Sequence, residues 1–186
     1  GNVISGNRGM GVLIGSSATG AIVQGNTIGL SAARTVGIGN GGEGVHINPG
    51  TNAVIGGTAA GAGNVIAFNG SAGVLILAGT SDAILGNSIY SDGGLGIDLG
   101  AQGTVQANDG LDLDLGANNL QNYPVLSKVL TTGSTVEITG SLSSNALGTF
   151  RIEFFSNTSA DASGYGEGQL FLGSTDITTS LTGVGS

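Results

Sequence analysis

The chain has 186 residues and a formal net charge of −8, from 12 acidic and 4 basic side chains, and only 9% of its residues are charged. Nucleic acids and anionic membrane surfaces favour clustered Lys and Arg, so neither is an expected partner. Cysteine is absent, which excludes disulfides and thiolate metal sites, and no apolar run is long enough to insert into a membrane.

A repeat of three short phrases fills residues 1–100. The first phrase, Gly-Asn-x-Ile, begins at Gly1, Gly25, Gly63 and Gly86. The second, Gly-[Val/Ile]-x-[Ile/Leu], begins at Gly11, Gly44, Gly73 and Gly96, and the third begins at Ala21, Ala53 and Ala83. Short β-branched phrases bounded by turn residues indicate strands. Their fixed order predicts an all-β fold, a right-handed parallel β-helix with three sheets and about four rungs.

Alternation within each phrase predicts which side chains point inward. The first phrase contributes an inward ladder of Ile4, Ile28, Ile66 and Ile89. The asparagines before them, Asn2, Asn26, Asn64 and Asn87, are expected to stack and hydrogen-bond from rung to rung. Five residues further on, Asn7, Asn69 and Asp92 are expected to adopt the left-handed conformation of a tight corner, and glycines such as Gly44 and Gly73 to allow similar turns.

The outward rows hold little chemistry. The second phrase presents Leu13, His46, Leu75 and Asp98 in one row. Leu13 and Leu75 beside His46 predict an interaction surface that packs on a neighbour, or leucines that lie under a folded-back loop. His46 and Asp98 are two rungs apart, about 10 Å, too far for a hydrogen bond, and no acid is placed to orient His46. No catalytic residue is therefore predicted, and the chain is not expected to be an enzyme.

An acidic bridging segment is expected over residues 101–122. It contains Asp109, Asp112 and Asp114 in a Gly-rich stretch, and hard oxygen ligands of this kind suit Ca²⁺. The spacing does not match an EF-hand loop. Ca²⁺ is thus the one cofactor that the sequence suggests, and the alternative is a solvated linker whose leucines cap the end of the repeat.

The composition changes after the bridge. Aromatic residues become frequent from Tyr123 onward, and longer alternating runs appear, as in Phe150-Arg151-Ile152-Glu153-Phe154. We expect residues 123–186 to form a small antiparallel Ig-like sandwich, which offers four or five strands where about seven are usual and is therefore expected to be incomplete.

The phrases GNVISGN, IGGTAAGAGNVIAFN and GNSIYSDGGLGIDLG, with the later NNLQNYPVL and FRIEFFSN, resemble a group of β-helix repeat proteins of bacterial surfaces, many of which begin with a CSLREA segment. The resemblance covers nearly the whole chain, although the CSLREA segment itself is absent. It implies a secreted or cell-surface structural or adhesive protein and carries no catalytic residues with it. The β-helix is also the fold of polysaccharide lyases and hydrolases, so a carbohydrate-binding or carbohydrate-cleaving module is the alternative.

The first repeat phrase begins at the first residue. Asn2, Val3 and Ile4 are therefore expected to form an edge that another chain could complete. The expected partners are further copies, neighbouring parts of a parent polypeptide, or surface glycans. Two interpretations stay open: a fragment or module of a longer protein, and the subunit of a filament.

Overall fold

The computed structural model describes residues 1–100 and 102–186, which are all-β apart from one 3-10 turn, η1 (Ala117–Leu120). Residue 101, where the bridging segment was expected to start, lies outside the described residues. The sequence predicts a repeat domain over residues 1–100, a bridging segment over 101–122 and a sandwich over 123–186. The structure contains two compact units, each built from several stretches of the sequence. Unit 1 comprises Gly1–Val105, Gly116–Asn118 and Glu153–Gly173, and unit 2 comprises Gln106–Leu115, Asn119–Ile152 and Ser174–Ser186.

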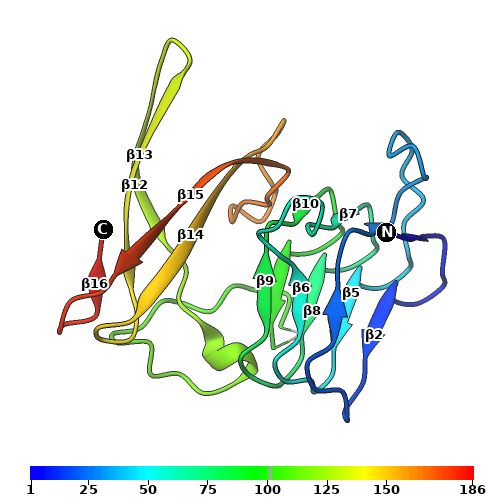
Figure 1. Cartoon of the computed structure of the whole chain (residues 1–186), viewed down its shortest axis with the longest axis horizontal. Helices are drawn as coiled ribbons and strands as arrows, with labels where there is room; N and C mark the ends of the chain where they lie inside the picture. The colour runs from blue at the N-terminus through cyan, green and yellow to red at the C-terminus, as the bar shows by residue number, and fades with distance from the viewer. Residues whose placement is uncertain (101) are drawn as a thin grey trace. The chain divides into compact units, whose positions relative to one another are not determined.

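Three parallel sheets of short strands make up most of unit 1 (Figure 1). Sheet A contains β1 (Val3–Ile4), β4 (Thr27–Ile28), β7 (Val65–Ala67) and β10 (Ser88–Tyr90), in that order. Sheet B contains β2 (Val12–Ile14), β5 (Val45–Ile47), β8 (Val74–Ile76) and β11 (Ile97–Leu99). Sheet C contains β3 (Ile22–Val23), β6 (Val54–Gly56) and β9 (Ala83–Leu85). Each strand pairs with its counterpart one repeat away, an arrangement compatible with the predicted parallel β-helix.

The repeat phrases pair in the register that the sequence predicts. Ile4, Ile28, Ile66 and Ile89 are aligned across sheet A. Their side chains pack with the inward residues of the other two sheets into one core, in which Ile28, Val45, Ile55 and Ile76 are fully buried. At about 25 cal/mol per Å² of apolar surface removed from water, this core is the main stabilising contribution in unit 1.

The predicted asparagine ladder is confirmed at the start of the sheet A strands. Asn2, Asn26, Asn64 and Asn87 follow one another along it. The backbone N–H and the Nδ2 group of Asn2, Asn26 and Asn64 each donate to Oδ1 of the next asparagine, at 2.8 to 3.1 Å. Asn26, Asn64 and Asn87 are buried, so the ladder satisfies polar groups that water does not reach.

The prediction for the next corner was wrong. Asn7, Asn69 and Asp92 do not have positive φ; the residues before them do, with φ of 71° at Gly6, 61° at Phe68 and 56° at Ser91. The side chains instead form a second ladder, in which Asn7 donates to Asn40, Asn40 to Asn69 and Asn69 to Asp92. Asn40 comes from the second repeat, where an insert changes the spacing, so the sequence pattern did not show that Asn40 is equivalent to Asn7 and Asn69.

The glycines that open the sheet B phrases also have a different role from the one expected. Gly44 and Gly73 are not among the residues with positive φ. A Cβ on Gly44 would lie 2.5 Å from Cγ2 of Ile66, and one on Gly73 would lie 2.5 Å from Cγ2 of Ile89. These positions require glycine because core side chains approach the backbone closely, not because of a left-handed turn.

Later segments of unit 1 supply hydrogen-bond acceptors to the last repeat. Oε2 of Glu153 accepts from the N–H of Gly86 at 2.8 Å. Oε1 of Glu167 accepts from the N–H of Asp92 at 3.2 Å and so ends the second ladder. In the third corner, Oδ1 of Asn118 accepts from the N–H of Asp82 at 2.9 Å. These acceptors satisfy N–H groups that a further repeat would otherwise bind.

The segment Glu153–Gly173 also pairs with the backbone of β10, the last strand of sheet A. Ile89 and Gly168 exchange two hydrogen bonds of 2.9 Å in an antiparallel bridge. Because β10 then has a partner on both sides, the exposed edge that a terminal parallel strand would present is closed there. Together with the Glu153 and Glu167 side chains, this bridge defines a cap formed by Glu153–Gly173.

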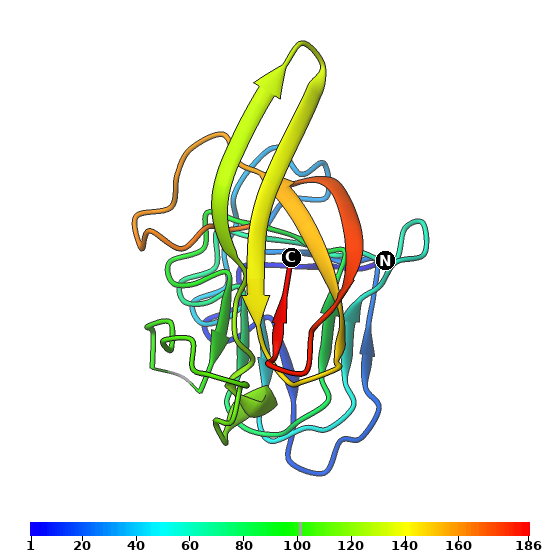
Figure 2. The same cartoon turned by 90° about the vertical axis from the view of Figure 1, so that its left-hand side faces the viewer.

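The remaining strands are antiparallel. Unit 2 holds β12 (Val125–Thr132), β13 (Thr135–Ser143) and β16 (Val184–Gly185) in one sheet. β14 (Thr149–Ser156) pairs with β15 (Leu170–Thr178), and each strand runs from one unit into the other. Figure 2 shows β12 and β13 as a long twisted ribbon. The antiparallel sheets agree with the expected all-β sandwich at the level of fold class.

A bulge sets the two faces of the β12–β13 ribbon. The pairing shifts by one residue between Leu126 and Lys128, which brings Leu126 to the same side as Val129. Val129 is opposite Ile138 on that side, so the face is apolar, while Lys128 and its neighbours face the other way. Leu126 and Val129 are more than half exposed.

Candidate functional site

An open groove lies on the outer side of sheet A, entirely within unit 1. Its volume is about 470 Å³. The floor comes from the outward residues of β7 and β10, and the walls come from two segments that are far apart in the sequence. The lining residues are Arg34, Val65, Ser88, Tyr90, Ser156, Asn157, Thr158, Gln169 and Leu170. Concave surfaces that combine apolar area with a few polar groups are the usual form of a ligand site.

The first wall is the insert of the second repeat, which folds back on the sheet. Leu30 and Gly37 form an antiparallel bridge, and the N–H of Ile38 donates to the carbonyl of Gly29 at 2.8 Å. The insert packs against the Phe68 ring, which a Cβ on Gly37 would approach to 2.7 Å. The wall is therefore held by backbone hydrogen bonds and close contacts at both of its ends.

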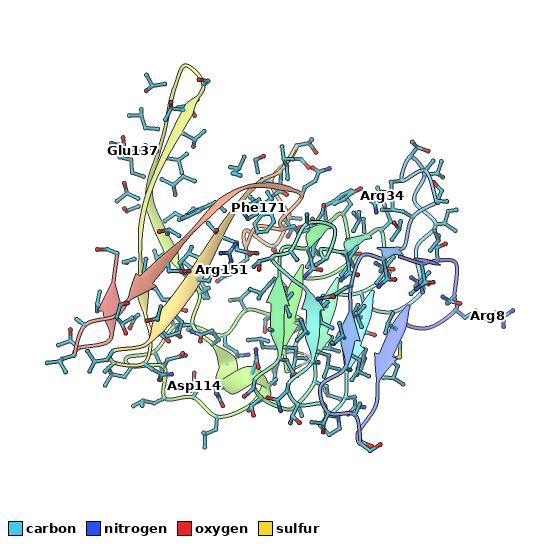
Figure 3. The ribbon with its side chains drawn as sticks, viewed as in Figure 1. Arg8, Arg34, Asp114, Glu137, Arg151 and Phe171 are labelled. Carbon is cyan, nitrogen blue, oxygen red and sulfur yellow. The ribbon has the colours of Figure 1, made fainter. Side chains whose placement is uncertain are left out.

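Arg34 carries the charge of this wall. Its backbone has a φ of 57°, and its Nε donates to Oγ1 of Thr27 at 2.9 Å. Thr27 is buried, so the bond holds the guanidinium group over the sheet. Among the described residues the salt bridges join His46 to Glu43 and Lys128 to Glu137, and neither includes Arg34. Figure 3 shows Arg34 well separated from Arg8.

Tyr90 provides the aromatic part of the floor. Its ring meets the Phe68 ring edge to face, with centroids 5.9 Å apart and an interplanar angle of 79°. Beside it, Oγ of Ser88 donates to the carbonyl of Gln169 at 2.6 Å. The edge-to-face contact restricts the Tyr90 ring, and the Ser88 bond ties the floor to the second wall.

The second wall belongs to the cap segment. Oδ1 of Asn157 accepts from the N–H of Gln169 at 2.8 Å, and Oε1 of Gln169 accepts from the N–H of Thr158 at 3.3 Å. These amides are fixed by bonds within the wall. The groove as a whole offers one guanidinium group, one phenol ring, hydroxyls and amides, a set that binds polar ligands by charge, stacking and hydrogen bonds.

No family model matches this chain, and no curated protein matches it. Function therefore rests on the geometry of the molecule itself.

His46 has a partner that sequence reasoning missed. Its Nδ1 lies 3.3 Å from Oε2 of Glu43, and Nε2 is buried without a hydrogen-bond partner among the described residues. Glu43 is three residues away and stands before the strand, where alternation within the phrase does not apply.

The outward row of Leu13, His46, Leu75 and Asp98 is aligned as expected, but Leu75 is only 4% exposed whereas Leu13 is 57% exposed.

The three acids of the bridging segment lie in unit 2 and have different surroundings. Asp112 is buried, and its carboxylate accepts from the N–H of Asn122 at 3.0 Å and from Oγ of Ser144 at 2.6 Å. Asp109 accepts from the N–H of Leu113 through Oδ2, while its Oδ1 is buried without a partner. Asp114 is partly exposed. In residues 1–100 and 102–186 no three acidic or histidine side chains gather in a group that could hold a metal ion.

The residues predicted as an assembly edge are at the border of sheet A. β1 is the outermost strand of the sheet, and Val3 is 49% exposed. Asn2 donates to Asn26, and Ile4 packs against the core.

Within the described chain, no helix is both long enough and apolar enough to cross a membrane.

Proposed function

We propose that the chain is part of a non-catalytic extracellular protein with a structural or adhesive role. In this proposal the repeats form a right-handed parallel β-helix, and the later strands form a small Ig-like sandwich of the kind found in β-helix proteins of bacterial surfaces. The observation that carries the proposal is the groove over sheet A, whose walls are held in place by the side-chain and backbone hydrogen bonds of a rigid repeat.

The chemistry of the groove supports binding over turnover. Hydrolysis of a glycosidic bond commonly uses two carboxylates, one as acid and one as base or nucleophile. The nine lining residues include Arg34 and Tyr90 but no carboxylate. A fixed surface of this composition is suited to holding a partner at the cell surface.

The test is to incubate the purified chain with acidic and neutral polysaccharides and to measure both retention on the polysaccharide and release of new chain ends. Retention without release is the expected result. Release that disappears in an Arg34→Ala variant would show instead a carbohydrate-cleaving module. Surface labelling of the producing cells with an antibody tests the extracellular location, and absence of labelling on intact but not on opened cells contradicts it.

Assembly into filaments is a second candidate, supported by the edge position and exposure of β1. Electron microscopy of the purified chain tests it. Filaments that disappear when Val3 is replaced by Lys or Pro are the expected result, because a charge or a missing N–H blocks pairing along an edge strand. Single particles at every concentration contradict it.

Calcium binding near Asp109 stays a prediction, supported by the buried, unpartnered Oδ1 of that residue. Removal of divalent ions with a chelator should lower the melting temperature of the wild type and leave an Asp109→Asn variant unchanged. Equal melting temperatures of the wild type with and without chelator would contradict a calcium site.

A further inference from the structure

We propose that the groove over sheet A binds an anionic glycan, with the acidic group of one sugar held by Arg34 and the ring of that sugar lying against Tyr90. This inference rests on the adhesive function proposed above and adds the chemical class of the ligand. The acidic group is a carboxylate, a sulfate or a phosphate, which share the paired oxygens that a guanidinium group recognises.

The charge of the groove is opposite to that of the whole chain. The net charge is −8, yet Arg34 is the one charged side chain among the nine lining residues. Because Nε is bonded to Thr27, Nη1 and Nη2 are the nitrogens of this lining residue that would bind a ligand. A guanidinium group that is already held in position loses less conformational entropy on binding than a mobile one. The groove is therefore prepared for an anion.

The backbone around the floor favours a sugar over a peptide. Peptides commonly add to a protein as an extra strand along a free sheet edge. Here β7 lies between β4 and β10, and β10 is itself bridged to the cap through Ile89 and Gly168. A sugar needs no such edge, since its C–H face can pack on the Tyr90 ring while its hydroxyls meet amides and hydroxyls such as those of Gln169 and Thr158.

A neighbouring hollow limits which sugars can follow. It has a volume of about 350 Å³ and shares Asn157 and Thr158 with the groove. Asp161 is part of its lining, and hydrogen bonds from Ser163 lower the pKa of the Asp161 carboxyl, so this group stays negatively charged. A second acidic sugar on that side would be repelled. The best ligand then alternates acidic and neutral sugars.

Titration of the isotope-labelled full chain, followed by NMR, tests the proposal with five probes. The acidic probes are a hyaluronan tetrasaccharide, a sulfated galactan tetrasaccharide and a mannose 6-phosphate disaccharide. The neutral probe is chitotetraose, and the peptide probe is hexaglutamate. We expect at least one acidic sugar to shift the signals of Arg34, Ser88 and Tyr90, with weaker binding of chitotetraose and hexaglutamate. Which acidic sugar binds identifies the acidic group.

Matched variants separate the groove from general charge. Arg34→Ala should weaken binding by about tenfold or more, the effect of losing a charge-assisted hydrogen bond. Arg8→Ala removes the same charge from another exposed site and should change the affinity less than about twofold. Tyr90→Ala should weaken binding without changing its salt dependence. Unchanged melting temperatures of Arg34→Ala and Arg34→Lys confirm that the scaffold is intact, and the lysine variant replaces the alanine one if the latter fails to fold.

Any of three results overturns the proposal. The first is equal affinity of the Arg34→Ala and Arg8→Ala variants, and the second is binding of chitotetraose or hexaglutamate at least as tight as that of every acidic sugar. The third is no shift with any acidic probe at about 10 mM, a concentration at which binding with a millimolar Kd is detected. None of these results affects the structural role of the protein, because retention on polysaccharides and assembly are measured separately.

Discussion

One residue at a corner of the repeat, Asp92, makes the stability of the fold dependent on pH. Asp92 stands in a series whose other members are asparagines, and burial raises the pKa of its carboxyl to about 7, with the Glu167 charge as a smaller contribution in the same direction. Oδ2 of Asp92 is buried without a hydrogen-bond partner among the described residues. The folded state therefore holds a proton on Asp92 at pH values where the unfolded chain has released it.

The sign of the effect follows from proton uptake. Between about pH 4 and pH 7 the folded state binds more protons at Asp92 than the unfolded state does, so the contribution of this group to the free energy of unfolding falls as pH rises. Asp92→Asn removes the free-energy cost of burying a charged carboxylate, and it places an Nδ2 donor at this position of the ladder, as at Asn69. We expect the variant to be more stable than the wild type by about 2 to 4 kcal/mol at pH 8 and equally stable near pH 4.

Thermal unfolding of both proteins across this pH range measures the difference. Asp176→Asn, which removes an exposed carboxylate of β15, is the control and should follow the wild type. A constant difference between Asp92→Asn and the wild type at all pH values would show that the proton on Asp92 is not involved.

Glycine at the start of a sheet B phrase gives a second prediction at this scale. A Cβ on Gly73 would lie 2.5 Å from Cγ2 of Ile89, 2.7 Å from Oδ2 of Asp92 and 2.8 Å from the carbonyl oxygen of Gly96. Gly73→Ala should lower the free energy of unfolding by about 1 to 3 kcal/mol, as overpacking in a core does. Gly15→Ala, where a Cβ would meet no atom within 4 Å, is the matched control in chemical denaturation. Equal loss in both variants would contradict the packing explanation.

At the scale of elements, the ladders join strands that have only two or three residues each. Asn64 accepts from the N–H and Nδ2 of Asn26 and donates to Oδ1 of Asn87 and to the carbonyl of Val23. Strands this short have few backbone hydrogen bonds of their own, so the side-chain ladder is a large share of the polar contacts between repeats.

Position within the ladder should determine the effect of a substitution. Asn64→Ala removes the acceptor of the buried N–H and Nδ2 groups of Asn26 and the donor to the carbonyl of Val23, while the backbone N–H of residue 64 still donates to Asn87. We expect the free energy of unfolding to fall by about 3 kcal/mol or more. Asn2→Ala, at the exposed start of the same ladder, removes only the donation to Asn26 and should lower stability by about 1 kcal/mol or less. Urea titration of both variants measures the gradient, and equal losses would show that the ladder does not act as a connected series.

Much of the strand pairing in unit 1 could be predicted from the sequence, because the repeat shows which residues are equivalent. Equivalent residues recur in fixed order, so the pairing of Ile28 with Ile66 and the first asparagine ladder follow from the spacing alone. The second ladder could not be seen in full, since Asn40 lies in a repeat lengthened by an insert. The groove was missed for a similar reason: Arg34 and Gln169 come from non-repeating segments, and no period relates them.

At the scale of the whole molecule, the strands of unit 1 and the strand β12 of unit 2 differ in how far they are protected from solvent. In unit 1, Val45, Ile66 and Val74 are fully buried between paired strands on both sides. In unit 2, every residue of β12 is exposed. Amide hydrogens open to exchange most easily where few buried apolar contacts hold the strand.

Hydrogen exchange followed by mass spectrometry tests this distribution. Peptides covering β5, β7 and β8 should exchange slowest, and those covering the turn between β12 and β13 should exchange within the earliest time points. Binding of a partner to the apolar face of the ribbon would appear as protection confined to β12 and β13. Uniform exchange along the chain would contradict the difference in burial.

The cap has a consequence for the order of events during synthesis. Asp92 and the Glu167 side chain that accepts its N–H are 75 residues apart. At roughly 5 to 20 residues per second, a ribosome needs about 4 to 15 seconds to make that stretch. During this time the last repeat of the nascent chain has been made but β10 still has an unpaired edge, which can pair with another chain nearby. A delay in translation between these two residues should therefore increase aggregation more than an equal delay placed after Gly173.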